Sequence, residues 1–444
     1  MLINISDACR PGDNSLEGVH VLLTSQFAPP AADVEILRGL ARRKHILASQ
    51  EKMDNYRKIW TQANDLKMSK PPIFINEICW NEFRSIDLLK CRCTDPVAKL
   101  FEGELRKEIF IAENNLGNYI VEDYIEVPII IYDTDFDIGE KVDIRKTDET
   151  NGIVSRHFKP FIKTMDDVSR IKMPEIHIEQ ELTDKLEALF HEIYDGIIPL
   201  RKVGGRGYWF TPWDYLIRTT GVEDAMIGMY DDPDFIEAIV KRYVDCSMEK
   251  MRRYSELGLW ASNNTSVRVG SGGYGYISKL EPEKHSNDTN CDLKQMWGCG
   301  NAQIFSDVSP AMHWQFSLQY ELEWISKFGV SYYGCCEPLY RKMDIMRKIP
   351  NLRKISMSPW NDLKVASEEI GKDYVMSCKP SPAIFASETF SEDETRAVIA
   401  KVLKDTEGSN IELIMKDIST VNYEPQRLIR WAAIAQEEID RVYG

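Results

Sequence analysis

Short apolar runs alternate with helix-like patterns along the second half of the chain. Runs of this kind are typical of buried parallel strands, while apolar positions that recur every third or fourth residue indicate helices covering a sheet. Strand, loop and helix repeated at this spacing predict consecutive βαβ units. The predicted strands are Gly204–Phe210, Ser266–Val269, Ala302–Phe305, Val330–Tyr333, Lys354–Met357, Tyr374–Met376 and Glu412–Met415.

Helix start and stop signals lie between several of these runs. Asp232 is an N-cap residue before Pro233 at the first helical position, and Gly258 ends the apolar stripe that follows. Ser309-Pro310 opens a second helix, which Gly329 ends. A third helix opens at Glu424-Pro425, and its apolar face holds Leu428, Trp431, Ala432, Ala435 and Ile439.

The pattern before residue 195 is mixed. Charged helices are predicted over residues 31–70, and Pro71-Pro72 ends them. Pro72–Ile78 and Glu126–Tyr132 are predicted strands. We therefore expect residues 1–195 to form an N-terminal extension of helices and strands, packed on the domain that follows and leading into it.

Residues 196–444 are predicted to form the core of an α/β fold, a (β/α)8 barrel of the TIM type. The alternative is a doubly wound open sheet, but no GxGxxG sequence follows a predicted strand. Gly270–Gly275 does not have that spacing and is predicted to be a flexible loop. In a barrel, the loops after the carboxyl ends of the strands build the active site.

Charge and composition exclude several functions. The 444 residues carry a net charge of −15 without a Lys/Arg-rich block, which argues against nucleic-acid and membrane-surface partners. The sequence shows no apolar run of membrane-spanning length and no secretory signal, so we expect a cytoplasmic protein. Ten cysteines in a chain of this length do not indicate a disulfide framework, and some could be metal or catalytic thiols.

Thiol and carboxyl residues follow three of the predicted strands. Asp307, the Cys335-Cys336 pair and Cys378 could converge at one end of a barrel. A carboxylate and two thiolates would give zinc three protein ligands and leave one position open, as in catalytic zinc sites. The alternatives are that the cysteines are small buried residues and that Asp307 only favours the dipole of the helix after it.

Further candidates lie near the same loops. Glu337, next to the cysteine pair, could act as a proton donor or a ligand; the alternatives are a loop carboxylate and a salt-bridge partner. His313 lies in the first turn of the helix after Asp307. An aromatic segment could form a wall for a flat or methylated substrate, or simply be core. Its candidate substrate-binding residues are Trp209, Phe210, Trp213 and Asp214.

At these residues the chain resembles the uroporphyrinogen-decarboxylase-like proteins, in the branch that holds the corrinoid-dependent methyltransferases. The resemblance covers most of the chain. It is clearest in Trp209–Asp214, Phe305–His313, Tyr333–Leu339, Lys354–Trp360 and Tyr374–Pro382.

The resemblance implies a barrel with zinc at its mouth. Members that use methylcobamide have a His-x-Cys pair where this chain has Gly334-Cys335-Cys336, so the histidine is missing here. Members that demethylate aryl methyl ethers use an Asp and two later Cys residues. Asp307, Cys335 or Cys336, and Cys378 match that order, with a slightly longer last gap.

The expected function is therefore zinc-dependent demethylation of a small substrate, with transfer of the methyl group to a corrinoid (cobalamin) carried by a partner protein. No Asp-x-His-x-x-Gly corrinoid signature is present in the chain itself. An aryl methyl ether leads as donor, ahead of methylamines and betaine-like compounds. A decarboxylase or lyase is the rival, but Asn76–Trp80 lacks the arginines that hold a porphyrinogen. A catalytically silent binding protein and a homodimer also stay open.

Overall fold

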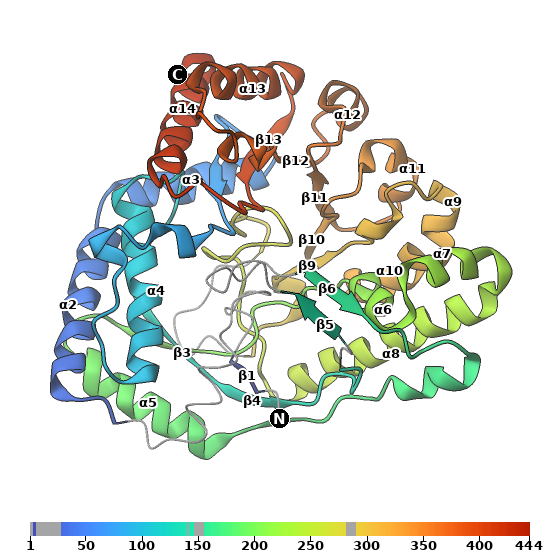
Figure 1. The fold of residues 1–444 in the computed structure, drawn as a ribbon, viewed down its shortest axis with the longest axis horizontal. Helices are drawn as coiled ribbons and strands as arrows, with labels where there is room; N and C mark the ends of the chain where they lie inside the picture. The colour runs from blue at the N-terminus through green and yellow to red at the C-terminus, as the bar shows by residue number, and fades with distance from the viewer. Residues whose placement is uncertain (1–2, 6–27, 140–141, 146–154, 281–289) are drawn as a thin grey trace.

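The computed structural model describes residues 3–5, 28–139, 142–145, 155–280 and 290–444. Its centre is a parallel sheet of six strands, which curls into a half-barrel (Figure 1). The strand order is β2-β13-β12-β11-β10-β9. The strands are β2 Ile73–Ile75, β9 Trp297–Gly300, β10 Val330–Tyr333, β11 Leu352–Met357, β12 Val375–Cys378 and β13 Asn410–Met415.

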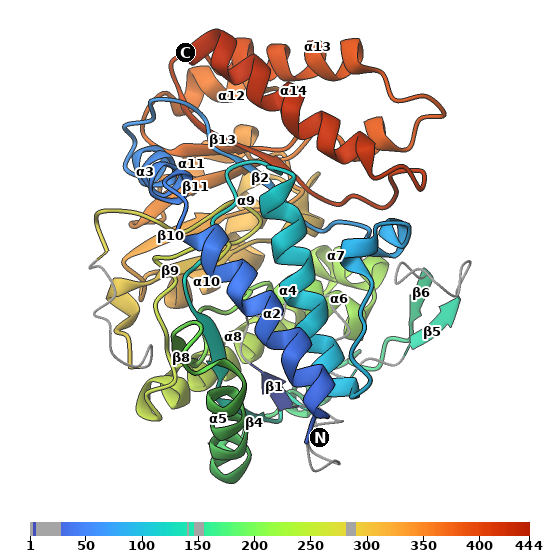
Figure 2. The same cartoon turned by 90° about the vertical axis from the view of Figure 1, so that its left-hand side faces the viewer.

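Helices cover the outer side of this sheet, with α11 to α14 at the rim in Figure 1. On the other flank α2 and α4 pack side by side (Figure 2). The helices are α2 Ala31–Ala48, α3 Lys52–Asn64, α4 Pro96–Glu113, α5 Gln180–Tyr194, α6 Pro212–Thr220, α7 Val222–Asp231, α8 Pro233–Glu256, α9 Pro310–His313, α10 Gln319–Ile325, α11 Met343–Met346, α12 Leu363–Ile370, α13 Glu392–Asp405 and α14 Gln426–Tyr443. Within the described residues, no helix is long and apolar enough to cross a membrane.

Smaller sheets complete the fold. A three-stranded antiparallel sheet has the order β1-β4-β7, β5 and β6 form an antiparallel pair, and β3 pairs in parallel with β8. Their bounds are β1 Ile3–Ile5, β3 Ile125–Pro128, β4 Ile130–Asp133, β5 Val142–Arg145, β6 Ser155–Phe158, β7 Ile176–Ile178 and β8 Leu200–Val203.

The predicted helix starts are confirmed. Asp232 accepts a hydrogen bond from the Phe235 amide at 3.3 Å and caps α8, and Ser309 caps α9 in the same way. The helix predicted from Ser309 to Gly329 is interrupted, however, because a π-helical turn over Trp314–Leu318 separates α9 from α10.

Three predicted strands are wrong. Gly204–Phe210 follows β8 as irregular chain, Ser266–Val269 belongs to no strand, and Ala302–Phe305 contains a 3-10 turn after β9. Gly204 shows the reason for the first: an added Cβ would lie 1.9 Å from the carbonyl oxygen of Leu259. This glycine allows close approach of two backbones rather than marking the start of a regular strand.

The prediction of an eight-stranded barrel is confirmed only as a six-stranded half-barrel. The Asn118 side chain accepts from the Ile73 amide of β2 at 2.7 Å. The Asn263 side chain accepts from the Trp297 amide of β9 at 2.8 Å and donates to the carbonyl oxygen of the same residue at 2.9 Å. At both edges of the sheet, a side-chain amide therefore forms hydrogen bonds that a neighbouring strand would otherwise form.

The glycine-rich segment Gly270–Gly275, predicted to be a flexible loop, is buried. Its backbone closes a turn through a hydrogen bond from the Val269 amide to the Gly273 carbonyl at 3.0 Å. An added Cβ at Gly272 would meet side chains of Tyr332, Ser377 and Glu412, which come from β10, β12 and β13. The segment therefore fills the concave side of the curled sheet. The prediction failed because the glycines serve close packing there and not chain freedom.

The division of the chain at residue 195 stays a prediction. The six-stranded sheet takes β2 from one side of that boundary and its other five strands from the other side.

Candidate functional site

Two cysteine side chains meet just after the carboxyl end of β10. The Sγ atoms of Cys335 and Cys336 lie 3.6 Å apart. Cys335 is buried, with 6% of its surface exposed, whereas Cys336 is exposed to solvent. In folds built on parallel strands, the loops at this end commonly carry the reacting groups.

Local contacts hold the loop in place. Gly334 has φ +99°, and an added Cβ there would lie 2.4 Å from a Leu339 methyl carbon, so only glycine fits the turn. The buried Glu337 carboxylate accepts from the Cys335 amide at 2.9 Å and from the Ala302 amide at 3.2 Å. The Ser356 hydroxyl donates to the Cys335 carbonyl at 2.5 Å. Glu337 therefore fixes the loop, which is the loop-carboxylate alternative considered from the sequence.

A chain of charges from three other loops lies beside the pair. Lys416 Nζ is 3.8 Å from Cys335 Sγ, 3.7 Å from Glu77 and 3.1 Å from Asp417. Arg268 forms a 2.7 Å ion pair with Glu77. None of these four residues was predicted from the sequence as a site residue. Lys416 and Asp417 directly follow the predicted strand Glu412–Met415, so the strand-end rule could have found them.

The two thiols differ in acidity. A hydrogen bond from Cys335 is the main cause that lowers the pKa of Cys336, and the Lys416 ammonium acts in the same direction. The same hydrogen bond, together with burial, raises the pKa of Cys335. Burial acts to lower the pKa of Lys416, but Cys335 and Glu77 outweigh it and raise the pKa above its usual range. Cys336 is therefore the thiol that ionises first, next to a lasting positive charge.

Cys378 does not join this pair. It ends β12 in register with Met357, and it belongs to the apolar cluster between sheet and helices. Its neighbour Ser377 points the other way, toward the glycine-rich segment, because successive side chains alternate across a strand. Burial raises the pKa of the Cys378 thiol to about 12.

The predicted zinc ligands are therefore not gathered in one place. Asp307 is exposed in the loop before α9, and Cys378 faces the helices. Throughout the described part of the chain, no three His, Cys, Asp or Glu side chains are arranged to hold a metal ion. The set of Asp307, Cys335, Cys336 and Cys378 does not fit zinc in this structure.

His313 is completely buried. Its Nε2 lies 2.9 Å from the Tyr333 hydroxyl, and its Nδ1 lies 3.3 Å from Lys342 Nζ. Burial, with a smaller contribution from Lys342, lowers the pKa of His313 to about 3. The neutral imidazole of His313 on α9 therefore lies between Tyr333 of β10 and Lys342, and it joins α9 to the sheet.

The aromatic segment is mostly core. Phe210 is completely buried and stacks on Trp324 with 4.7 Å between ring centroids. Trp213 is also completely buried, and its indole donates to the Phe316 carbonyl at 2.9 Å. The Asp214 carboxylate accepts a 2.8 Å hydrogen bond from the side-chain amide of Gln303. Trp209 is partly buried against the apolar cluster that contains Tyr332. Of these four, Phe210 and Trp213 do not reach a surface that a substrate could touch.

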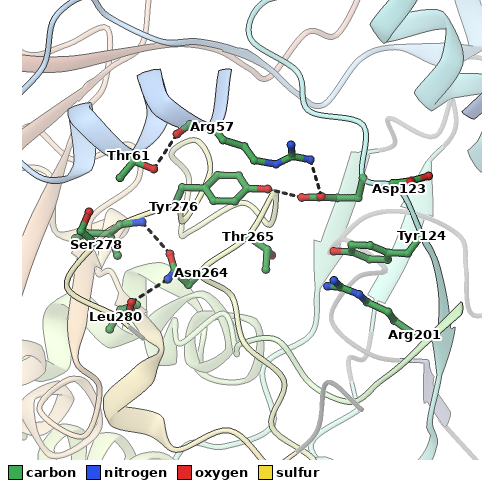
Figure 3. A pocket seen from close by; sticks show the side chains of 12 residues that line it. Arg57, Thr61, Asp123, Tyr124, Arg201, Asn264, Thr265, Tyr276, Ser278 and Leu280 are labelled. Atoms are coloured by element: carbon green, nitrogen blue, oxygen red, sulfur yellow. Dashed lines mark hydrogen bonds and ion pairs between the residues drawn. The ribbon is translucent and has the colours of Figure 1, made fainter. Parts of the chain in front are cut away.

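A cavity of about 620 Å³ lies elsewhere, beside the amino ends of β3 and β8 (Figure 3). Glu122 accepts from Arg57 at 3.1 Å and from the Tyr276 hydroxyl, and the Arg201 guanidinium lies 3.9 Å over the ring of Tyr124. This cavity was not predicted, because its walls come from α3, the segment before β3, Arg201 of β8 and residues between 264 and 280, which are far apart in the sequence.

Comparisons with known proteins assign neither a family nor an activity to this chain. No family model matches the chain, and no curated protein matches it. Among solved structures, a methyltransferase from Methanosarcina mazei superposes with a TM-score of 0.49 at 13% sequence identity. The match covers 88% of this chain and 99% of that chain. A likeness of this degree does not carry an activity over to this chain.

Proposed function

We propose that this chain is a methyltransferase that demethylates a small substrate and passes the methyl group to a separate corrinoid protein. The sequence resemblance motivates the reaction class, with an aryl methyl ether as the leading donor. One observation carries the proposal: an exposed thiol with a lowered pKa lies at the carboxyl ends of the sheet strands, 3.6 Å from a second thiol. In this proposal the Cys336 thiolate accepts the methyl group, and the residues around it assist the transfer.

The residues of this chain divide the work as follows. The Cys336 thiolate is a soft nucleophile suited to a methyl carbon. Attack on the methyl group forms a carbon–sulfur bond and breaks the carbon–oxygen bond of the ether, and the oxygen leaves with the bonding electrons. Lys416, which keeps its proton because its pKa is raised, lies next to the pair and offsets the negative charge on that oxygen.

The second half returns the thiolate. A corrinoid on a docked partner protein would supply a strong nucleophile for the methyl carbon. The carbon–sulfur bond would then break, and its electrons would return to Cys336 as the thiolate. We assign no step to zinc, since the predicted ligand set does not fit one. We also propose that the six-stranded half-barrel described above is part of an eight-stranded barrel, as the family resemblance implies.

The test follows the methyl group. The full chain is incubated with an aryl ether that carries an isotopically labelled methyl group, without a corrinoid protein, and its peptides are analysed by mass spectrometry. We expect label on the peptide containing Cys336, none in Cys336→Ser, and unchanged labelling in the control Cys378→Ser. Demethylation by Cys336→Ser at the wild-type rate contradicts the proposal.

A further inference from the structure

The cysteine pair has a geometry that methyl transfer does not require. Among the described cysteines, Cys336 is the exposed one, and a buried thiol lies 3.6 Å from its sulfur. A single nucleophilic thiol would serve the reaction alone. An exposed thiol with a buried thiol in contact is instead the arrangement in which one sulfur is attacked from solution and the second resolves the product.

We infer that Cys335 and Cys336 form a redox-modification site, which closes to a disulfide between neighbouring residues by exchange with a small-molecule disulfide. The sulfur atoms must approach from 3.6 Å to about 2.05 Å, a movement of side chains and of the one peptide between them. This inference rests on the proposed function only for its consequence, the loss of the thiolate that accepts the methyl group.

The exchange balances without any further reagent. The Cys336 thiolate attacks one sulfur of the small disulfide, whose S–S bond breaks, and the first small thiol leaves with a proton from solvent. Cys335 then loses its proton and attacks Cys336 Sγ, which releases the second small thiol. The protein loses two electrons and two protons, and the small disulfide gains them.

The surroundings suit this exchange. Lys416 Nζ lies 3.8 Å from Cys335 Sγ, so a positive charge faces the resolving sulfur while it attacks as a thiolate. Lys416 also contacts Glu77 and Asp417, so its charge stays paired once the disulfide has removed the thiolate. The Glu337 and Ser356 contacts to the Cys335 backbone hold the loop while the ring closes, which favours reversal by reductant rather than local unfolding.

The test counts thiols and does not depend on a methyl donor. The full chain is treated with oxidised glutathione, and free thiols and intact mass are measured after denaturation. For the treated wild type we expect a loss of two free thiols per chain, without glutathione attached to the protein. Dithiothreitol should restore both thiols. Cys335→Ser should keep one glutathione attached, and Cys336→Ser should lose no thiol. Cys378→Ser serves as the control that behaves like the wild type.

A second probe tests, without oxidation, whether the two thiols are close enough to be bridged. Phenylarsine oxide, whose arsenic bridges two close thiols with loss of water, should bind the wild type with one arsenical per chain and bind neither single variant. A stable mixed disulfide on wild-type Cys336, or equal arsenical binding by Cys335→Ser, overturns the inference. Failure of methyl transfer alone leaves both readouts unchanged and therefore speaks only against the proposed function.

Discussion

Glu321 holds its proton under conditions in which most carboxyl groups have lost theirs. It is completely buried on α10, and burial raises its pKa to about 8. Ser317 donates a 2.5 Å hydrogen bond to it. The nearby carboxylates Glu337 and Asp214 push in the same direction, so the neutral acid is the form that the core accepts.

Glu321→Gln is expected to change how stability depends on pH. Between the unfolded pKa of 4.5 and the folded value near 8, the folded chain binds more protons than the unfolded chain, so the free energy of unfolding falls as pH rises. Glutamine removes this loss, and the variant should gain about 3–5 kcal/mol on the wild type between pH 4.5 and pH 8.5. Urea unfolding at both pH values measures it, with the exposed Glu368→Gln as control. Equal gains in both variants contradict the assignment.

The site was predicted from the sequence in part. The pair Cys335-Cys336 was identified because it follows a strand that the pattern places correctly, over Val330–Tyr333. Cys378 was assigned to the same place from its position after a strand and from the ligand order that the resemblance implies. The alternation of side chains within β12 puts it with Met376 on the helix side, which position along the chain does not reveal. Lys416 directly follows a predicted strand, but the sequence does not show that its side chain lies beside Cys335.

The glycine-rich segment packs against side chains from distant elements. An added Cβ at Gly273 would lie 2.2 Å from the ring of Trp60, which is completely buried on α3. By contrast, Gly39 lies in the middle of α2, and nothing lies within 4 Å of an added Cβ there. A larger residue would therefore clash at Gly273 but would have free space at Gly39.

Gly273→Ala should destabilise the protein, and Gly39→Ala should stabilise it. The first forces Trp60 or the turn to move, which costs about 1–3 kcal/mol in a packed core. The second gains about 0.5–1 kcal/mol, because alanine loses less backbone freedom than glycine in a helix. Thermal unfolding of both variants checks the pair. A neutral Gly273→Ala would mean that the segment does not fill the concave side of the sheet.

Strands and helices were predictable to different degrees. β10 to β13 and the start of α8 were found because their apolar runs and caps are local signals. β9 was missed, since its sequence Trp-Gly-Cys-Gly contains two glycines. Gly298 lies against the ring of Phe328, where an added Cβ would be 2.4 Å from a ring carbon. The contact with Phe328 that requires glycine at this position is made in the fold and is not visible in the sequence.

A buried ion pair joins segments that are far apart in the sequence. Lys354 of β11 and Glu412 of β13 are completely buried, 2.8 Å apart. Lys354 also lies over the rings of Trp60 and Trp297, at 5.7 Å and 5.3 Å from their centroids. Glu412 accepts from the amide of Gly273 at 3.1 Å. The pair therefore connects the sheet, α3 and the glycine-rich segment.

Lys354→Met should be strongly destabilising, and adding Glu412→Gln should recover much of the loss. Removal of the ammonium leaves a buried carboxylate without a counter-charge, which costs about 3–5 kcal/mol. Glutamine removes that charge and can still accept from the Gly273 amide. A double-mutant cycle by guanidinium unfolding measures the coupling. If the double variant loses as much as the sum of the single variants, the pair does not act as one unit.

The asparagines at the two edges of the sheet also bear on how this protein behaves at high concentration. A foreign strand that seeks to extend the sheet at β2 or β9 must find open amides and carbonyls. The Ile73 amide is already taken by Asn118, and both polar groups of the Trp297 backbone are taken by Asn263. Such occupied edges discourage strand addition and the fibrillar aggregation that begins with it.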